Sequence, residues 1–204
     1  KSTLMRIISG LIKSWEGGIL FNGKSIKEDN SYLSKVGFLI EEPAFYEPLS
    51  AVQNLTILSR LTNSPTSKIV DILKKVELDD FSNKIVSEFS YGMKQRLGIA
   101  QAILNDPNIL FLDEPSNGLD PIGMVEMNKI IRKLNAQGKT ICISTHVLEH
   151  VKDLCSHVII LKEGRLVLDD SIENLFSSTT KYEIKSPNIK SLKANLSKLT
   201  DLNI

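Results

Sequence analysis

The sequence predicts an α/β fold in which a mainly parallel β-sheet is covered by helices on both faces. Short, almost continuously apolar segments alternate with amphipathic helical segments, which is typical of a parallel sheet buried on both sides. A stretch around 47–105 contains only helical patterns. The 204 residues are enough for a sizeable hydrophobic core. We therefore expect a helical subdomain inserted between two strands of this sheet.

In the first half of the chain, an apolar periodic run behind the opening Lys-Ser-Thr predicts a helix. The segment "GGILFNG" predicts a short strand closed by an Asn-Gly turn, and "KVGFLI" predicts another strand. A proline-punctuated loop, "EEPAFYEPLS", leads into the helical insertion. There, Pro65 fits the first position of a helix whose apolar face begins at Ile69, and residues 91–104 predict a further helix.

The second half continues the alternation of strands and helices. The segments "NILFLDEP" and "TICIST" predict buried strands, "PIGMVEMNKIIRKLNAQG" and "VLEHVKDLC" predict helices, and "HVIILKEGRLVLDD" predicts a hairpin. In the last segment, "KYEIK" alternates like a strand, and a helix could begin at Ser186-Pro187. We therefore expect a main domain over 1–177 and the start of a truncated accessory region over 178–204.

Composition and charge narrow the classes of function. The chain has 25 Lys and Arg residues against 24 Asp and Glu residues, so a net charge of +1 gives no indication of a nucleic-acid partner. No apolar run approaches the roughly 18 residues that span a bilayer, so membrane association is expected to come through another protein. Cys142 and Cys155 lie in or near apolar segments, which predicts small buried thiols in the reducing cytoplasm.

The segment "ILFLDEP" carries the strongest chemical signal. Four apolar residues precede Asp113 and Glu114, which places two carboxylates at the carboxyl end of a buried strand, where α/β sheets bind ligands. Because consecutive side chains of a strand point to opposite faces, the two acids should have different roles. Asp113 fits a Mg²⁺ ligand, and Glu114 could polarise an attacking water. The alternative is a strand that simply ends in an acidic turn.

Two further segments could contribute to a phosphate site. Ser90 precedes a helix, and Gly92 near its start would let a phosphate approach the backbone N–H groups at the positive end of the helix dipole. Alone, this pattern is more typical of an ordinary capped helix. His146 follows a buried strand and could touch a phosphate or orient a water. With Glu149 and His150 it also spells H-x-x-E-H, an inverted zinc-protease motif, but the sequence supplies no obvious third ligand.

Taken in order, these motifs resemble the ATP-binding subunit of ATP-binding cassette (ABC) transporters. The opening Lys-Ser-Thr is similar to the end of the Walker A loop, G-x-x-G-x-G-K-S-T. "FSYGMKQR" resembles the signature L-S-G-G-Q-x-Q-R, "ILFLDEP" the Walker B strand, "SNGLD" the D-loop and "STH" the H-switch. The resemblance covers about residues 1–175 and implies a fold of the P-loop NTPase type.

The resemblance also implies a role for each matching residue. Glu114 would act on the attacking water and His146 on the γ-phosphate. The remaining residues implied at ATP and Mg²⁺ are Lys1, Ser2, Thr3, Glu41, Asp113, Ser90, Gly92 and Asp120, of which Ser2, Asp113 and Glu41 would hold the metal ion. Ser90 and Gly92 would reach the ATP of a second ATP-binding subunit in a head-to-tail dimer, with residues 117–120 across the interface.

Three departures from the family pattern stand out. Tyr91 and Met93 replace the usual Gly and Gln of the signature, and Glu41 replaces a Gln, which adds negative charge beside the phosphates. The glycines that precede the Walker A lysine are absent. We therefore expect the chain to be truncated at Lys1 and to bind ATP poorly by itself.

Glu41 and the segment "EEPAFYEPLSAVQNL" resemble the cassettes of bacteriocin and lantibiotic immunity exporters. This implies an ATPase that drives export of antimicrobial peptides through a transmembrane permease subunit, on the inner face of the cell membrane. Three alternatives remain: a cassette of another multidrug or peptide exporter, a non-transport cassette ATPase, or a regulatory subunit that binds nucleotide weakly.

Overall fold

The computed structural model describes residues 1–177, with residues 148–150 and 176–177 described by their backbone alone. Its strands are β1 (Leu20–Phe21), β2 (Lys24–Ser25), β3 (Val36–Leu39), β4 (Ile109–Asp113), β5 (Thr140–Ser144), β6 (His157–Lys162) and β7 (Arg165–Ser171). Its α-helices are α1 (Ser2–Ile8), α2 (Ala51–Leu61), α3 (Ile69–Lys75), α4 (Tyr91–Ala102), α5 (Pro121–Ala136), α6 (Leu148–Leu154) and α7 (Ile172–Ser177). Short 3₁₀ helices are η1 (Asn30–Lys35), η2 (Thr66–Lys68), η3 (Asp79–Phe81) and η4 (Val86–Glu88).

The central sheet is parallel, with the strand order β3-β4-β5. Its register pairs Leu39 with Leu112 and Asp113 with Ser144, so the three strands end at one common edge. Strands β6 and β7 form a separate antiparallel hairpin, as predicted. These pairings confirm the predicted α/β fold with a parallel sheet.

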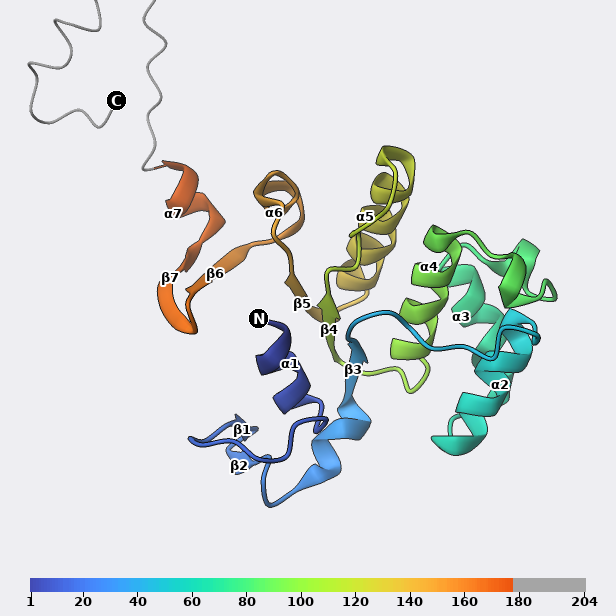
Figure 1. Ribbon diagram of the computed structural model, residues 1–204, viewed down its shortest axis with the longest axis horizontal. Helices are drawn as coiled ribbons and strands as arrows, with labels where there is room; N and C mark the ends of the chain where they lie inside the picture. The colour runs from blue at the N-terminus through green and yellow to red at the C-terminus, as the bar shows by residue number, and fades with distance from the viewer. Residues whose placement is uncertain (178–204) are drawn as a thin grey trace, which may run out of the picture.

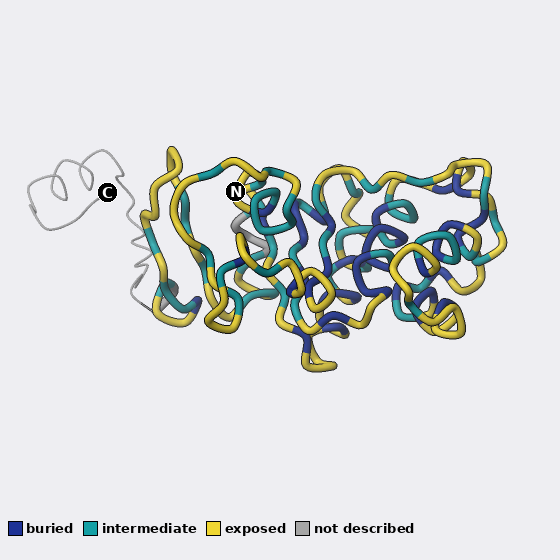
Figure 2. Tube along the Cα trace, turned by 90° about the horizontal axis from the view of Figure 1, so that it is seen from below, coloured by how far each residue is buried: buried dark blue, intermediate teal, exposed yellow. Residues whose placement is uncertain are grey.

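Helices pack on both faces of the central sheet (Figure 1). Successive side chains of a strand point to opposite faces, so each face presents its own hydrophobic cluster for the helices to cover. On one face, Leu110 and Leu112 are fully buried against the helices of the insertion and α5. On the other face, the rings of Phe38 and Phe111 stack 5.6 Å apart beside Ile8 at the end of α1. Buried chain is concentrated on the side of the insertion, whereas the β6–β7 side is largely exposed (Figure 2).

The insertion between β3 and β4 is helical, as predicted. Helix α2 begins with a capping box in which Ser50 and Gln53 bond each other's backbone N–H groups. The four apolar residues spaced along α3, namely Ile69, Ile72, Leu73 and Val76, are all buried. Pro65 has an extended ψ of 121° and is the N-cap residue of η2, the short 3₁₀ helix that leads into α3. Its predicted place at the first helical position is therefore wrong by one residue.

Helix α5 carries Pro121 in its first turn, and Gly138 follows its end with a φ of +88°. The predicted Asn-Gly turn joins β1 to β2, with positive φ at both Asn22 and Gly23. Both cysteines are free, and Cys142 occupies an exposed position of β5, so the expectation that its thiol is buried is wrong. The predicted strand and helix in 178–204 lie outside the described residues.

Candidate functional site

Polar residues gather at the edge where the strands of the parallel sheet end. Glu41 lies two residues after β3, Asp113 and Glu114 come at the end of β4, and His146 lies two residues after β5. Because parallel strands end at the same side of a sheet, residues separated by up to 105 positions in sequence are brought to one edge. This is the edge at which α/β sheets bind ligands.

The carboxylate of Glu114 is held between two basic side chains. Its Oε1 lies 3.6 Å from Nζ of Lys1, and its Oε2 lies 3.0 Å from Nδ1 of His146. The side chains of Lys1 and His146 are 40% and 63% exposed, so solvent and a ligand can reach both. Glu114 has a φ of +48°, a conformation that is uncommon outside glycine and that turns the chain sharply away from the strand.

Asp113 occupies a more enclosed position on the other side of the strand. It is 8% exposed, and Ser144, its partner in the register of β4 and β5, donates a hydrogen bond from Oγ to its Oδ1. The backbone N–H of Glu114 donates to the carbonyl oxygen of Ser144 at 3.1 Å and to its Oγ at 3.3 Å. Ser144, itself 5% exposed, therefore fixes both acids relative to β5.

Helix α1 contacts this edge at two places. Lys1 is its N-cap residue and donates from Nζ to the carbonyl oxygen of Thr145 at 2.6 Å. Ser2 and Thr3 begin the helix, Ser2 half-buried and Thr3 exposed. Nearer its end, Arg6 forms an ion pair with Glu41. The described contact of the Glu41 carboxylate is therefore with a guanidinium group.

The remaining predicted residues form a second group around the loop 115–119. Ser90 is the N-cap of α4, where its Oγ accepts a hydrogen bond from the N–H of Met93 at 3.2 Å. A Cβ added at Gly92 would lie 3.4 Å from Leu119, so the start of α4 is packed against this loop. Asp120 ends the loop and caps α5, with Oδ1 accepting from the N–H of Gly123 at 2.7 Å.

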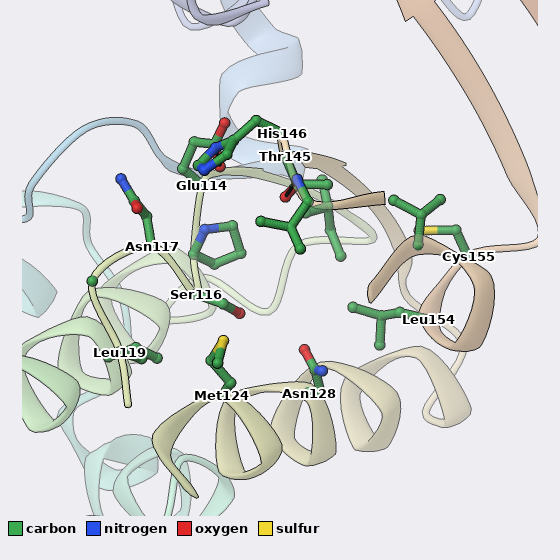
Figure 3. Close-up of a pocket in the computed structure, with 15 residues that line it drawn as sticks. Glu114, Ser116, Asn117, Leu119, Met124, Asn128, Thr145, His146, Leu154 and Cys155 are labelled. Carbon is green, nitrogen blue, oxygen red and sulfur yellow. Dashed lines mark hydrogen bonds and ion pairs between the residues drawn. The ribbon is translucent and has the colours of Figure 1, made fainter. Parts of the chain in front are cut away.

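A cavity of about 190 Å³ lies beneath Glu114 and His146 (Figure 3). It is enclosed by loop 115–119, α5 and the chain from the end of β5 to Cys155, and Asn128 of α5 projects into it. Most of the lining is apolar, and its ionisable side chains Glu114 and His146 lie at the upper rim. The cavity therefore lies along the inner side of loop 115–119.

Comparison with known proteins connects this geometry with a family. A family model described as "ABC transporter" matches residues 1–117, which is more than half of the chain. The chain belongs to the ABC transporter family. It is 39% identical over 189 residues to the lantibiotic transport ATP-binding protein SrtF of Streptococcus pyogenes, an alignment that covers 90% of this chain and 82% of SrtF. It is 40% identical over 185 residues to the bacitracin transport ATP-binding protein BcrA of Bacillus licheniformis, covering 89% and 60%.

Solved structures of the ABC family share the fold. CbiO1 of Clostridium perfringens, described as part of the ABC transporter complex CbiONQ, superposes with a TM-score of 0.75 at 28% identity. The alignment covers 97% of this chain and 80% of CbiO1. A structure described as the ATP-binding subunit of an ABC transporter gives a TM-score of 0.73 at 25% identity, with 97% and 83% covered. The chain is accordingly an ATP-binding subunit of the ABC type, a class that hydrolyses ATP and works within transporter complexes.

Within residues 1–177, helices long and apolar enough to cross a membrane are absent. The same residues contain no group of three or more His, Cys, Asp or Glu side chains that could hold a metal ion by themselves. The zinc interpretation of H-x-x-E-H, which the sequence does not favour, depends on Glu149 and His150, whose side chains lie outside the described part.

Three residues of the site were given no individual role from the sequence. Ser144 and Thr145 belong to the motif "STH" at the end of a buried strand, but only His146 of that motif was assigned a function. The sequence offered no comparable signal for Arg6, because its partner Glu41 is 35 residues away and on another element.

Proposed function

We propose that this chain hydrolyses ATP with Glu114 as the residue that polarises the attacking water, and that hydrolysis drives export of antimicrobial peptides. The observation that carries the first part is the position of the Glu114 carboxylate, held between Lys1 and His146 at the carboxyl edge of the sheet. A general base must lie within hydrogen-bond reach of the proton it takes and must be held in place. The contacts with Lys1 and His146 hold the carboxylate of Glu114 in place.

The two basic side chains around Glu114 would have different roles in binding the phosphates and the attacking water. Lys1, whose side chain is 40% exposed, offers donors to β- and γ-phosphate oxygens, and Ser2 and Thr3 lie beside it at the start of α1. His146 would orient the water or contact the γ-phosphate, because its ring is exposed and already lies 3.0 Å from Glu114. Phosphoryl transfer depends mainly on such positioning and charge stabilisation.

The oxygen donors of this edge fit Mg²⁺. That ion takes oxygen ligands and is usually held by one or two carboxylates together with substrate phosphates. Asp113, kept in place by Ser144, and the hydroxyl group of Ser2 would hold it, with Glu41 as a third candidate. When bound, the ion would neutralise part of the phosphate charge.

The start of α4 would serve the ATP of a second subunit. Ser90 is exposed, and Gly92 lies in the first turn of α4, where N–H groups without an intrahelical acceptor and the helix dipole favour an anion. We propose a head-to-tail dimer in which loop 117–120 lies across the interface. A transmembrane permease would hold this dimer at the cytoplasmic face of the membrane.

The proposed cargo rests on likeness to transporters of peptide antibiotics. SrtF is named for lantibiotic transport and BcrA for bacitracin transport, at 39% and 40% identity. The acid at position 41 is the residue by which the sequence itself resembles immunity exporters. Expression with the matching permease should therefore raise the resistance of a sensitive strain to a lantibiotic, and unchanged resistance would contradict this part of the proposal.

Replacement of Glu114 by Gln tests the hydrolytic role. The amide has nearly the same shape but cannot accept a proton, so phosphate release should fall by about 10²- to 10⁴-fold, the usual contribution of a general base. ATP-driven dimerisation, measured by light scattering, should persist. Glu28→Gln, on an exposed loop outside the site, is the matched control and should leave turnover unchanged. Turnover of Glu114→Gln within a few-fold of wild type would refute the assignment.

A further inference from the structure

The ion pair between Arg6 and Glu41 joins two elements of the candidate site. Arg6 lies in the last turn of α1, and Glu41 lies in the loop that follows β3. Their side chains are 42% and 56% exposed, so the pair is open to solvent. At its other end α1 contacts Glu114 and Thr145 through Lys1. One short helix therefore touches the loops that follow all three parallel strands.

The backbone at Glu41 restricts where its carboxylate can lie. Glu41 has a φ of +62°, which is uncommon for a residue other than glycine, and Pro43 follows two positions later. From this position its carboxylate reaches α1, where it forms the ion pair with the guanidinium of Arg6. Arginine suits this contact, because its guanidinium group stays charged at all relevant pH values and its fork of donors matches a carboxylate.

The charges at this edge show what Arg6 contributes. Among the five residues Lys1, Arg6, Glu41, Asp113 and Glu114, two are cations and three are anions, so this group has a net charge of −1. Without Arg6 the net charge would be −2, in a place where a polyanion such as ATP is proposed to bind. With Arg6, position 41 is electrically neutral, as it would be if it carried the glutamine that is usual in the family.

We propose that Arg6 is a positioning residue that neutralises Glu41 and holds its carboxylate against α1, so that an acid can stand at position 41 without repelling ATP. This role rests on the proposed function. It predicts that Arg6 is needed only while position 41 is an acid. Removal of the guanidinium should weaken nucleotide binding, and removal of the acid as well should restore it.

A double-mutant cycle with Arg6→Gln and Glu41→Gln tests the role, using ATP as the probe both with Mg²⁺ and with EDTA. We expect Arg6→Gln to weaken ATP binding about fivefold, the upper range for an exposed charge pair. With EDTA, the double variant should return to within about twofold of wild type, because the proposed contact of position 41 with Mg²⁺ then plays no part. Arg6→Lys keeps the charge and should bind ATP nearly as well as wild type. Binding without Mg²⁺ reports the charge effect separately from turnover.

A matched control is the ion pair of Lys84 and Glu88, whose side chains are 38% and 57% exposed. The same cycle at these positions should change ATP affinity by less than about 1.5-fold. Thermal unfolding of all variants without nucleotide shows that each is folded and reports whether Arg6 and Glu41 interact.

Two results would overturn the proposal, and they are distinguishable. If wild type binds ATP but the deficit of Arg6→Gln persists in the double variant, the role of Arg6 is wrong and the proposed function stands. If wild type in its transporter complex binds no ATP, the proposed function fails and this role fails with it. Rescue in the double variant, with no effect in the control cycle, would support the role.

Discussion

Replacement of Ser144 by Ala should destabilise the fold through the buried acid of the site. The Oγ of Ser144 donates to Asp113, and the two residues are only 5% and 8% exposed. The variant leaves the carboxylate of Asp113 buried without this donor. The N–H of Glu114 would keep its bond to the carbonyl oxygen of residue 144, because that bond does not involve the side chain. The loss is therefore confined to the neighbourhood of Asp113.

A hydrogen bond to a charged group contributes about 1.5–3 kcal/mol, so we expect a loss of about 2 kcal/mol in the free energy of unfolding. With a urea dependence of about 2 kcal/mol per molar, the midpoint should fall by about 1 M. Urea titration followed by the fluorescence of Trp15 and by circular dichroism measures this shift. Agreement between the two signals would show that one transition is observed.

Ser34→Ala is the matched control for Ser144→Ala. The hydroxyl group of Ser34 donates to a backbone carbonyl oxygen at 2.7 Å, but in an exposed position, so its loss should cost less than about 0.5 kcal/mol. A cycle with Asp113→Ala should assign most of the Ser144 effect to the pair. A midpoint for Ser144→Ala within about 0.2 M of wild type would refute the reasoning, because a buried carboxylate would then have lost its donor without cost.

Two further predictions concern packing and pH. Gly37→Ala should destabilise the protein by about 3 kcal/mol or prevent folding, because the added Cβ would overlap the backbone carbonyl of Ala102 and lie 2.6 Å from Leu110. The yield of folded protein and the urea midpoint measure this effect. A midpoint equal to that of wild type would contradict the prediction. The pKa of Glu77 lies below its ordinary value of 4.5, chiefly because Lys133 donates a hydrogen bond to its carboxylate. Glu77 therefore stabilises the fold above about pH 4.5, and this stabilisation is lost as the pH falls towards the lowered pKa. Glu77→Gln should therefore flatten the decline of the urea midpoint between about pH 5 and pH 3, and an unchanged decline would contradict it.

The parallel sheet was predictable because its signals are local. Continuous apolar runs specify β3, β4 and β5, and the polar residues directly after each run reach one edge in any parallel arrangement. The nearness of Glu114 and His146 follows from this rule alone. Helix α5 was equally accessible, since proline at its start and glycine beyond its end mark both boundaries.

The features that were missed or wrongly predicted depend on contacts between distant segments. The bond from Ser144 to Asp113 requires the register of two strands, which short apolar runs do not specify. Cys142 lies in an apolar run, but its side chain is on the face of β5 that the described helices leave exposed. The same limit applies to β2, whose two residues form a strand only because β1 pairs with them.

The departures from the family pattern show why single motif positions are an incomplete guide. Tyr91 stands where the signature usually has glycine, and its ring lies against Gly118, where an added Cβ would come within 3.2 Å of it. Its hydroxyl oxygen accepts a hydrogen bond at 2.9 Å from Gln95, an amide only 4% exposed that needs a partner. Tyr91 thus fills space and satisfies a buried group. At Glu41 an unusual acid likewise meets Arg6, so in both cases the substitution and its partner must be judged together.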